Sequence, residues 1–395
     1  MKTAYIHTFG CKVNQFDSQV IREHFSALGY HFAQEPEEAD TIILNSCTVT
    51  SAADRQCRSL IRKITAANPR ARILLAGCYA RRSGGELLTE FPQLELLDTA
   101  SFLDKSIASF AEHSRAFLKI QDGCDAFCSY CIVPFVRPVL WSRPVSDIIS
   151  QVRALVKHGY PEIVLTGVHL GKYRGGLVPV LEAILGVAGN FRLRLSSLDV
   201  SEVTDGLVAL MRNNPARICR HLHIPLQSGS PAVLARMKRS YTAETFLRTV
   251  EKVREQLPDI GISTDVIVGF PGETDADFSA TCSMVESILF SRLHVFRYSP
   301  RPGTAAAAMK PLVDAKTIQE RSRILRAIGV AREERFWRSF AGTKRPIVME
   351  GENHTALTDN YIRIQVDKKT GSQFNGIFEL YITDINGKAW GKSSL

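Results

Sequence analysis

Three cysteines lie within eight residues of one another near the middle of the chain, at Cys124, Cys128 and Cys131. Thiolates hold iron–sulfur cubes, and a four-iron cube bound by only three of them keeps one iron without a protein ligand, where chemistry can take place. Zinc would need a fourth ligand at short spacing, and the nearest histidines, His113 and His158, are not so placed. A disulfide fails because three is an odd number. We therefore expect a catalytic iron–sulfur centre here.

A second set of cysteines is spread over the first part of the chain, at Cys11, Cys47 and Cys78. Each follows a short apolar run that is predicted to be a strand, at residues 4–7, 41–44 and 73–76. Because the carboxyl ends of parallel strands form the ligand crevice of an open sheet, the three thiols could converge there. One such cysteine alone would more often be a small buried residue. Three at the same position favour a second three-thiolate site.

The remaining three cysteines have no partners at ligand spacing. Cys57 lies in a basic stretch with the pattern of a helix, and Cys219 and Cys282 are isolated in the sequence. We expect all three side chains to serve packing.

The 395-residue chain has a formal net charge of +9. A basic balance suits an RNA or DNA partner, and a basic protein without any nucleic acid is the alternative. The N-terminus resembles a short strand rather than a signal peptide, and no apolar run approaches the roughly 20 residues that span a bilayer. We expect a soluble, cytoplasmic protein without a membrane partner, in a reducing compartment where thiols more often serve metals or catalysis.

The pattern of strands and helices predicts an α/β protein. Alternation up to about residue 100 favours a parallel sheet with helices on its faces. Further strands that alternate with helices are expected at residues 117–120, 162–166, 192–196, 221–225, 261–268 and 292–296. They suggest a partial (βα)6 barrel with its active site at the carboxyl ends of the strands, and an open doubly wound sheet is the alternative. After a charged helical stretch at 316–340, short alternating strands suggest a small antiparallel β-barrel.

The spacing Cys-x3-Cys-x2-Cys, with Tyr130 before the last cysteine, resembles the signature of the radical S-adenosylmethionine enzymes. The first hundred residues resemble the N-terminal domain of methylthiotransferases, in which three such cysteines hold an auxiliary iron–sulfur cluster. The segments at 7–15 and 45–50 are similar to the branch that modifies threonylcarbamoyladenosine in tRNA. The isopentenyladenosine branch usually has Gln-Met-Asn after the first cysteine and the ribosomal-protein branch has Pro-Lys-Asn, whereas this chain has Lys12-Val13-Asn14.

The resemblance covers nearly the whole chain, including the segments at 221–242 and 294–304, and it implies three domains. These are a methylthiotransferase N-terminal domain at 1–112, a radical S-adenosylmethionine core at 113–341 and an RNA-binding, TRAM-like β-barrel at 342–395. Four basic residues of the last domain could contact phosphate, with ordinary solvated surface as the alternative: Lys344, Arg345, Lys368 and Lys369.

Two [4Fe-4S] clusters and S-adenosylmethionine are the cofactors that the resemblance implies. One cluster would be held by Cys124, Cys128 and Cys131, and the other by Cys11, Cys47 and Cys78. The expected contacts to S-adenosylmethionine are Tyr130, Thr166, Gly167, Gln227, Ser228 and Val268. His221 and His223, which alternate along an expected strand, are assigned structural roles.

The function that the resemblance implies is conversion of threonylcarbamoyladenosine beside the anticodon of tRNA to its 2-methylthio form. One S-adenosylmethionine would methylate a sulfur held at the N-terminal cluster, and a second would supply the radical that activates carbon 2 of the adenine. The implied partners are the tRNA anticodon loop, an electron donor such as flavodoxin or ferredoxin, and a sulfur source. The alternatives are methylthiolation of isopentenyladenosine, or a non-catalytic iron–sulfur protein that binds RNA or senses redox state.

One segment departs from the family pattern. Pro138 stands where the family has a glycine and Trp141 where it has an arginine, whereas Arg137, Ser142 and Arg143 match. The departure bears on the conformation of this segment and on its contacts with the substrate.

Overall fold

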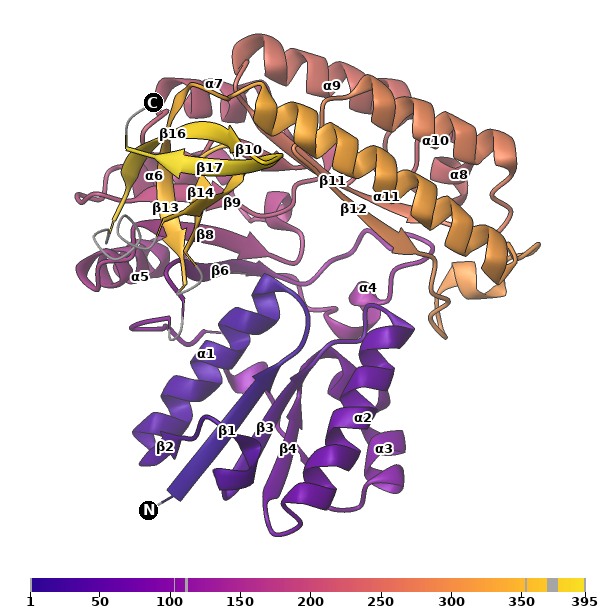
Figure 1. Ribbon diagram of the computed structural model, residues 1–395. Coiled ribbons are helices and arrows are strands. Elements are labelled where there is room, and N and C mark those ends of the chain that lie inside the picture. Colours follow the sequence, from indigo (N-terminus) through magenta and orange to yellow (C-terminus); the bar gives the residue numbers. More distant parts are fainter. Residues whose placement is uncertain (1, 103, 111–112, 352–353, 368–375, 394–395) are drawn as a thin grey trace.

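The computed structural model describes residues 2–102, 104–110, 113–351, 354–367 and 376–393. Figure 1 shows the N-terminal sheet below, the central strands and helices above it, and a small C-terminal barrel against the side of the central part. Within the described residues, no helix combines the length and the apolar composition that a membrane crossing requires.

The N-terminal part is a five-stranded parallel sheet in the order β2-β1-β3-β4-β5. The side chains of β3 and β4 alternate between the two faces of the sheet. Ile43 and Leu74 pack on one helix, α1, whereas Ile42 and Leu75 pack on the other face, against α2 and α3. The elements are β1 (Lys2–Thr8), α1 (Lys12–Ala27), β2 (Tyr30–Phe32), β3 (Thr41–Ser46), α2 (Ser51–Ala67), β4 (Arg72–Ala76), α3 (Gly77–Glu90) and β5 (Leu94–Leu96).

Six parallel strands form the central part, and they follow one another in chain order, β6-β8-β9 and β10-β11-β12. The bridges Leu193–Ile218 and Ser197–His223 join the two groups into one curved sheet. Because the order never reverses, the sheet is a partial barrel and not the doubly wound alternative. The strands are β6 (Ala116–Asp122), β8 (Glu162–Gly167), β9 (Arg192–Leu195), β10 (His221–His223), β11 (Gly261–Val268) and β12 (Arg292–Arg297), with β7 (Trp141–Ser142) antiparallel to β6.

The helices of the central part cover the outside of this curved sheet (Figure 1). Their apolar side chains join one continuous core with the barrel strands. They are α5 (Val145–Lys157), α6 (Leu177–Leu185), α7 (Asp205–Asn213), α8 (Pro231–Arg236), α9 (Ala243–Gln256), α10 (Asp275–Ser287) and α11 (Ala315–Arg338), and the short α4 (Val133–Val136) follows the central cysteines.

The C-terminal part is the expected small barrel, closed in the order β13-β14-β15-β17-β16. Its pairs are antiparallel except for β15 with β17, which is parallel. A ring of five strands cannot alternate direction all the way round, so one parallel pair is required. The strands are β13 (Lys344–Glu350), β14 (Thr355–Thr358), β15 (Arg363–Val366), β16 (Phe378–Ile385) and β17 (Lys388–Lys392).

A buried carboxylate fixes this small barrel to the central part. Glu162 on β8 is fully buried and accepts hydrogen bonds from Arg192 and Arg194 at 2.7 to 2.9 Å. The same two guanidinium groups donate to backbone carbonyls of the small barrel, at Pro346, Leu357, Thr358 and Asp359. The barrel is therefore held by a hydrogen-bonded ionic network, not by a loose linker alone.

The segment that departs from the family pattern holds the chain between the N-terminal and central parts. Trp141 donates from its indole nitrogen to Asp104 at 2.9 Å. Arg143 is buried and donates to the carbonyls of Lys119, Asp104 and Lys105. Pro138, the other departure in this segment, is exposed. Trp141 and Arg143 thus contact the protein itself.

Candidate active site

The central cysteines lie in a loop at the carboxyl end of β6. The loop begins with Gly123 at a φ of +82°, where a Cβ would lie 2.1 Å from the carbonyl oxygen of Val139, so the turn requires glycine. Cys124 Sγ lies 3.4 Å from Nδ1 of His169, which is on the loop after β8. Arg239 donates from Nη1 to Cys128 Sγ at 3.2 Å. Donors from two other loops therefore point at the thiols.

These donors also set the charge around the cysteine loop. Burial would raise the pKa of the Cys124 thiol, but the hydrogen bonds from His169 and from the backbone of Ala126 lower it overall. Burial opposes the charge on His169, yet its contacts with Cys124 and with Glu202, 2.7 Å from Nε2, raise its pKa to about 10. Burial raises the pKa of Cys131 to about 12. The protonated His169 therefore favours the thiolate form of Cys124.

The N-terminal cysteines converge on one cavity of about 490 Å³. Cys11 comes just before α1, Cys47 follows β3 and Cys78 is the second residue of α3, so all three lie at the carboxyl edge of the sheet, as the sequence predicts. Gly10 adopts a φ of +93°, and a Cβ there would lie 2.9 Å from Cys47 Sγ. Glycine is therefore needed for Cys11 and Cys47 to approach each other.

Both cysteine sets suit a cluster better than a single ion. Within the part of the chain that the structure describes, His223, Asp265 and His294 are the group whose ligand atoms all lie within 4.8 Å of one another. Neither cysteine set is so compact, whereas three thiolates on one zinc would each lie about 2.3 Å from it. A four-iron cube binds each thiolate through a different iron, so wider spacing fits.

One arginine touches both cysteine sets. The side chain of Arg137 is buried and donates from Nε to Cys78 Sγ at 3.3 Å, and its backbone carbonyl accepts from the Cys124 amide at 3.3 Å. Its remaining nitrogens donate to Asp122, Asp17 and Asn14 at 2.8 to 2.9 Å. Since Asn14 and Asp17 belong to α1, this network joins the N-terminal part to the barrel.

A second joint lies beside Cys47. Arg301, on the loop after β12, is buried and donates to Asp54 at 2.5 Å and to Thr48 at 2.7 Å. The hydroxyls of Ser51 and Ser299 lie 2.8 Å apart across the same interface. The loop that carries Cys47 is thereby held against the carboxyl ends of the barrel strands.

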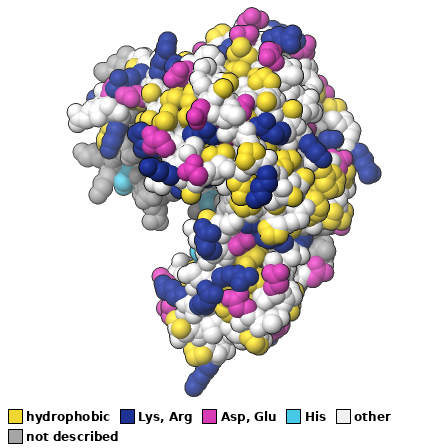
Figure 2. Space-filling model, turned by 90° about the vertical axis from the view of Figure 1, so that its right-hand side faces the viewer, with side chains coloured by type: hydrophobic (Ala, Val, Ile, Leu, Met, Phe, Trp, Pro, Cys, Tyr) yellow, Lys and Arg dark blue, Asp and Glu magenta, His cyan; other side chains and the backbone are white. Residues whose placement is uncertain are grey.

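The space-filling view shows a hollow between the N-terminal part and the rest of the molecule, with Lys and Arg side chains on both sides of it (Figure 2). Four basic residues of the small barrel were expected to contact phosphate, and the structure places two of them. Lys344 is half-exposed and pairs with Glu379. Arg345 is buried against Asp359 and Asp259, so the expectation that it contacts phosphate is wrong. Lys368 and Lys369 lie outside the described residues.

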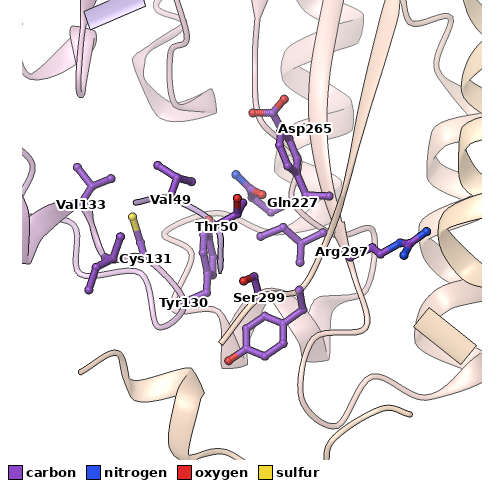
Figure 3. A pocket seen from close by; sticks show the side chains of 13 residues that line it. Val49, Thr50, Tyr130, Cys131, Val133, Gln227, Asp265, Arg297 and Ser299 are labelled. Carbon is purple, nitrogen blue, oxygen red and sulfur yellow. The ribbon is translucent and has the colours of Figure 1, made fainter. Parts of the chain in front are cut away.

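A smaller cavity adjoins the cavity of the N-terminal cysteines. Figure 3 shows Cys131, Tyr130, Gln227 and Val133 from the central part around it, together with Val49 and Thr50 from the Cys47 loop. Asp265, Val49, Val133 and Phe296 line both cavities. The two cavities are therefore neighbours, with the central cysteine loop beside one and the N-terminal cysteines beside the other.

The expected contacts to S-adenosylmethionine divide into three groups. Tyr130 and Gln227 line the smaller cavity, and Thr166 and Gly167 line the larger one. Ser228 and Val268 are buried and line neither cavity: the Ser228 hydroxyl lies 3.2 Å from that of Thr281, and the Val268 carbonyl accepts from the Tyr298 amide. Contact of Ser228 and Val268 with a cofactor stays a prediction.

Sequence reasoning missed several residues that face the larger cavity. Tyr361 comes from the small barrel and stacks on His221 with ring centroids 4.1 Å apart. His221 and His223, expected to be structural, both hydrogen-bond Ser263 and also line this cavity. Alternation along the strand placed both histidines on one face, but the sequence did not show that this face borders a cavity.

The remaining cysteines agree with the packing roles expected for them. Cys57 and Cys219 are buried, and Cys282 packs against the central core.

Comparisons with known proteins find matches for both the N-terminal part and the central part of the chain. Residues 3–98 match an uncharacterized protein family, UPF0004, and residues 118–285 match the Radical SAM superfamily. Two relatives are described as threonylcarbamoyladenosine tRNA methylthiotransferase MtaB. The protein of Thermotoga maritima is 38% identical, with 89% of this chain and 87% of the relative covered. The protein of Bacillus subtilis is 34% identical, with 92% and 90% covered.

A relative from Syntrophus aciditrophicus, described as tRNA-2-methylthio-N(6)-dimethylallyladenosine synthase, is 33% identical over 96% of this chain and 90% of its own length. Among solved structures, the radical S-adenosylmethionine methyltransferase TsrM from Kitasatospora setae superposes with a TM-score of 0.59 at 13% identity. That match covers 78% of this chain and 77% of the other, and it shows a shared fold.

Proposed function

Because the chain belongs to the radical S-adenosylmethionine methylthiotransferases, we propose that it converts threonylcarbamoyladenosine beside the anticodon of tRNA to the 2-methylthio form. The observation that carries this proposal is the pair of adjoining cavities, one beside each three-cysteine set. A methylthio transfer needs a sulfur carrier and a radical source that face the same substrate. The relatives from Thermotoga maritima and Bacillus subtilis support threonylcarbamoyladenosine as that substrate.

Family membership assigns S-adenosylmethionine and two [4Fe-4S] clusters as cofactors. We propose Cys124, Cys128 and Cys131 as the ligands of one cluster, and the N-terminal set of Cys11, Cys47 and Cys78 as the ligands of the other. When bound, the central cluster supplies the electron that cleaves S-adenosylmethionine, and the N-terminal cluster offers an open iron for the sulfur. Guanidinium groups from other segments already donate to one thiol of each set, Arg137 to Cys78 and Arg239 to Cys128.

The residues around the smaller cavity suit a bound S-adenosylmethionine. The cavity has apolar walls, including Ile132, Val133 and Ile267, which exclude water from a reactive radical. Gln227, at a φ of +62°, presents its side chain there, and Tyr130 forms part of the wall beside Cys131. The shared walls of the two cavities would let one substrate reach both cysteine sets. We propose domain boundaries after residues 112 and 341.

We also propose the remaining partners on chemical grounds. Single-electron cleavage of S-adenosylmethionine requires a reductant, such as flavodoxin or ferredoxin, and the transferred sulfur requires a source. The net charge of +9 and the hollow with basic side chains on both sides support the tRNA anticodon loop as the macromolecular substrate. Oxygen-sensitive clusters and a tRNA substrate both favour the cytoplasm.

Nucleoside analysis of tRNA tests the proposal. In cells that lack this chain, and that contain no second enzyme of the kind, 2-methylthio-threonylcarbamoyladenosine should disappear while threonylcarbamoyladenosine accumulates. Loss of the 2-methylthio-isopentenyl nucleoside instead would identify the other substrate. No change in either nucleoside would contradict the proposal and favour a non-catalytic iron–sulfur protein.

A further inference from the structure

Lys12 is the first residue of α1 and directly follows Cys11. Its side chain lines the larger cavity and is half-buried there. Among the described residues, Lys12 has no hydrogen-bond or ion-pair partner. The nearby carboxylates are engaged elsewhere: Asp265 lies 3.2 Å from Nε2 of His223, and Glu162 pairs with arginines. A half-buried ammonium without an anion beside a substrate cavity is an open binding position.

Two further polar atoms in the wall of this cavity lack partners. Ser196 Oγ and His221 Nδ1 are both buried without a hydrogen-bond partner in the described structure, and both residues line the cavity. Leaving such atoms unpaired costs free energy, so each marks a place where a bound polar group would be stabilised.

The hydrogen-bond chain beyond His221 identifies its open nitrogen as an acceptor. Burial holds the pKa of His221 well below its ordinary value, so the ring is neutral. In the tautomer of His223 that donates from Nε2 to the carboxylate of Asp265, at 3.2 Å, Nδ1 accepts from the Ser263 hydroxyl at 2.8 Å. Ser263 then accepts from Nε2 of His221 at 2.9 Å, and Nδ1 of His221 carries the lone pair.

The cavity wall therefore offers a cation, an acceptor and a hydroxyl to its ligand. A threonylcarbamoyl group carries a carboxylate, urea N–H donors, a hydroxyl and a carbonyl, which match all three. A dimethylallyl group has no polar atom and would leave the Lys12 ammonium unpaired in the occupied cavity. A site built for a polar group rejects the apolar analogue more strongly than an apolar pocket rejects a polar one.

We propose that Lys12 determines substrate specificity by binding the carboxylate of the threonylcarbamoyl group, with His221 and Ser196 pairing with its other polar atoms. This inference rests on the proposed function and adds the group that recognises the substrate. It predicts that discrimination between the two adenosine modifications is lost with the charge of Lys12, whereas binding of the tRNA backbone is kept.

The test compares one tRNA in three forms, with threonylcarbamoyladenosine, with isopentenyladenosine or with unmodified adenosine beside the anticodon. Affinity and single-turnover methylthiolation are measured for the cluster-loaded wild type and for Lys12→Met, Lys12→Gln and Lys12→Arg. Lys63→Met is the matched control, because Lys63 is exposed on α2. Iron content and uncoupled release of 5′-deoxyadenosine establish that each variant is folded and loaded.

We expect the wild type to prefer the threonylcarbamoyl form over the unmodified form by about tenfold or more in affinity, as for a charged hydrogen bond. Lys12→Met and Lys12→Gln should reduce that ratio to near one without weakening the unmodified tRNA, and Lys12→Arg and Lys63→Met should keep most of it. A full preference in both neutral variants would overturn the inference. Absence of product from the wild type would instead overturn the proposed function.

Discussion

The guanidinium of Arg137 donates a hydrogen bond to the sulfur of Cys78 at 3.3 Å. The same residue accepts the amide hydrogen of Cys124 at its carbonyl, so it touches a member of each cysteine set. Its pKa lies well above the ordinary value because the neighbouring thiol and carboxylates outweigh its burial. Arg137 is therefore a fixed charge in contact with both cysteine sets.

Replacing Arg137 should affect both stability and cluster content. Arg137→Met leaves the buried carboxylates of Asp122 and Asp17 without one of their cationic partners, and breaking such a pair costs about 3–5 kcal/mol. Arg137→Lys keeps the charge but loses the planar fork of donors. It should therefore be less destabilised than Arg137→Met, and it should still contain less iron than the wild type because the donor to Cys78 is lost. Urea unfolding and iron analysis measure the two effects, with Arg55→Met on the exposed face of α2 as the control. Wild-type stability and iron in Arg137→Met would contradict the structural role.

The two cysteine sets should be separable by mutation. Replacing Cys11, Cys47 and Cys78 together by Ala should reduce iron from about eight to about four per chain, if both sites carry cubes. Product should vanish, while 5′-deoxyadenosine release continues. Replacing Cys124, Cys128 and Cys131 should abolish that release. Cys57→Ala and Cys219→Ala are controls, since both thiols are buried in packing positions. Methylthiolation by the N-terminal triple variant would refute the two-cluster mechanism.

Local patterns were sufficient for most elements of this fold. The strand β11 was predicted at its observed bounds, because a β-branched apolar run begins at Gly261 and ends before Gly269. The short strands β2 and β14 were missed, since three or four residues are too few to show a period. Convergence of the N-terminal cysteines followed from a topological rule, because equivalent ends of parallel strands share one edge.

Contacts between distant parts of the chain could not be predicted in this way. Arg137 reaches Cys78, and Tyr361 reaches His221, only because the three parts pack together. Arg345 was expected at the surface because arginine usually is, and its burial depends on two carboxylates that only the tertiary structure brings near it. The place of Lys12 in a cavity wall likewise appears only when the distant segments of that wall are assembled.

The network at Glu162 should make stability depend on pH. Burial would raise the pKa of Glu162, but Arg194 and Arg192 hold it well below the ordinary value. A lowered carboxyl pKa stabilises the fold at any pH above the unfolded value of about 4.3, and this contribution is lost as the pH falls toward the folded value. Glu162→Gln should therefore cost about 3–5 kcal/mol at pH 7.

The difference in unfolding free energy between the wild type and Glu162→Gln should shrink between about pH 4 and pH 3. Only the wild type has the ionised carboxylate, so it alone loses stability as that group is protonated. Urea unfolding at several pH values measures it, and Glu251→Gln, at an exposed position on α9, is the control for loss of a carboxylate. A difference between wild type and Glu162→Gln that stays constant down to pH 3 would show that Glu162 carries no shifted pKa.

Substitutions at Tyr361 should change the stability of the protein and the function of the larger cavity by different amounts. Its backbone adopts a φ of +73°, in the left-handed region that costs a non-glycine residue about 1 kcal/mol or more. Its ring stacks on His221 and closes one side of the larger cavity. The strained conformation therefore holds an aromatic ring where the substrate is expected.

Tyr361→Ala and Tyr361→Gly both remove the ring, and they differ only in the backbone freedom of the residue. The glycine variant should be more stable than the alanine variant by about 1 kcal/mol, because glycine accepts a positive φ without steric cost. Both should lose most of the methylthiolated product, since the cavity loses its wall, whereas Tyr361→Phe should keep it. Urea unfolding and nucleoside analysis measure the two quantities. Equal stability of the two small variants would show that the backbone is unstrained, and full product from Tyr361→Gly would show that the ring does not form part of the substrate site.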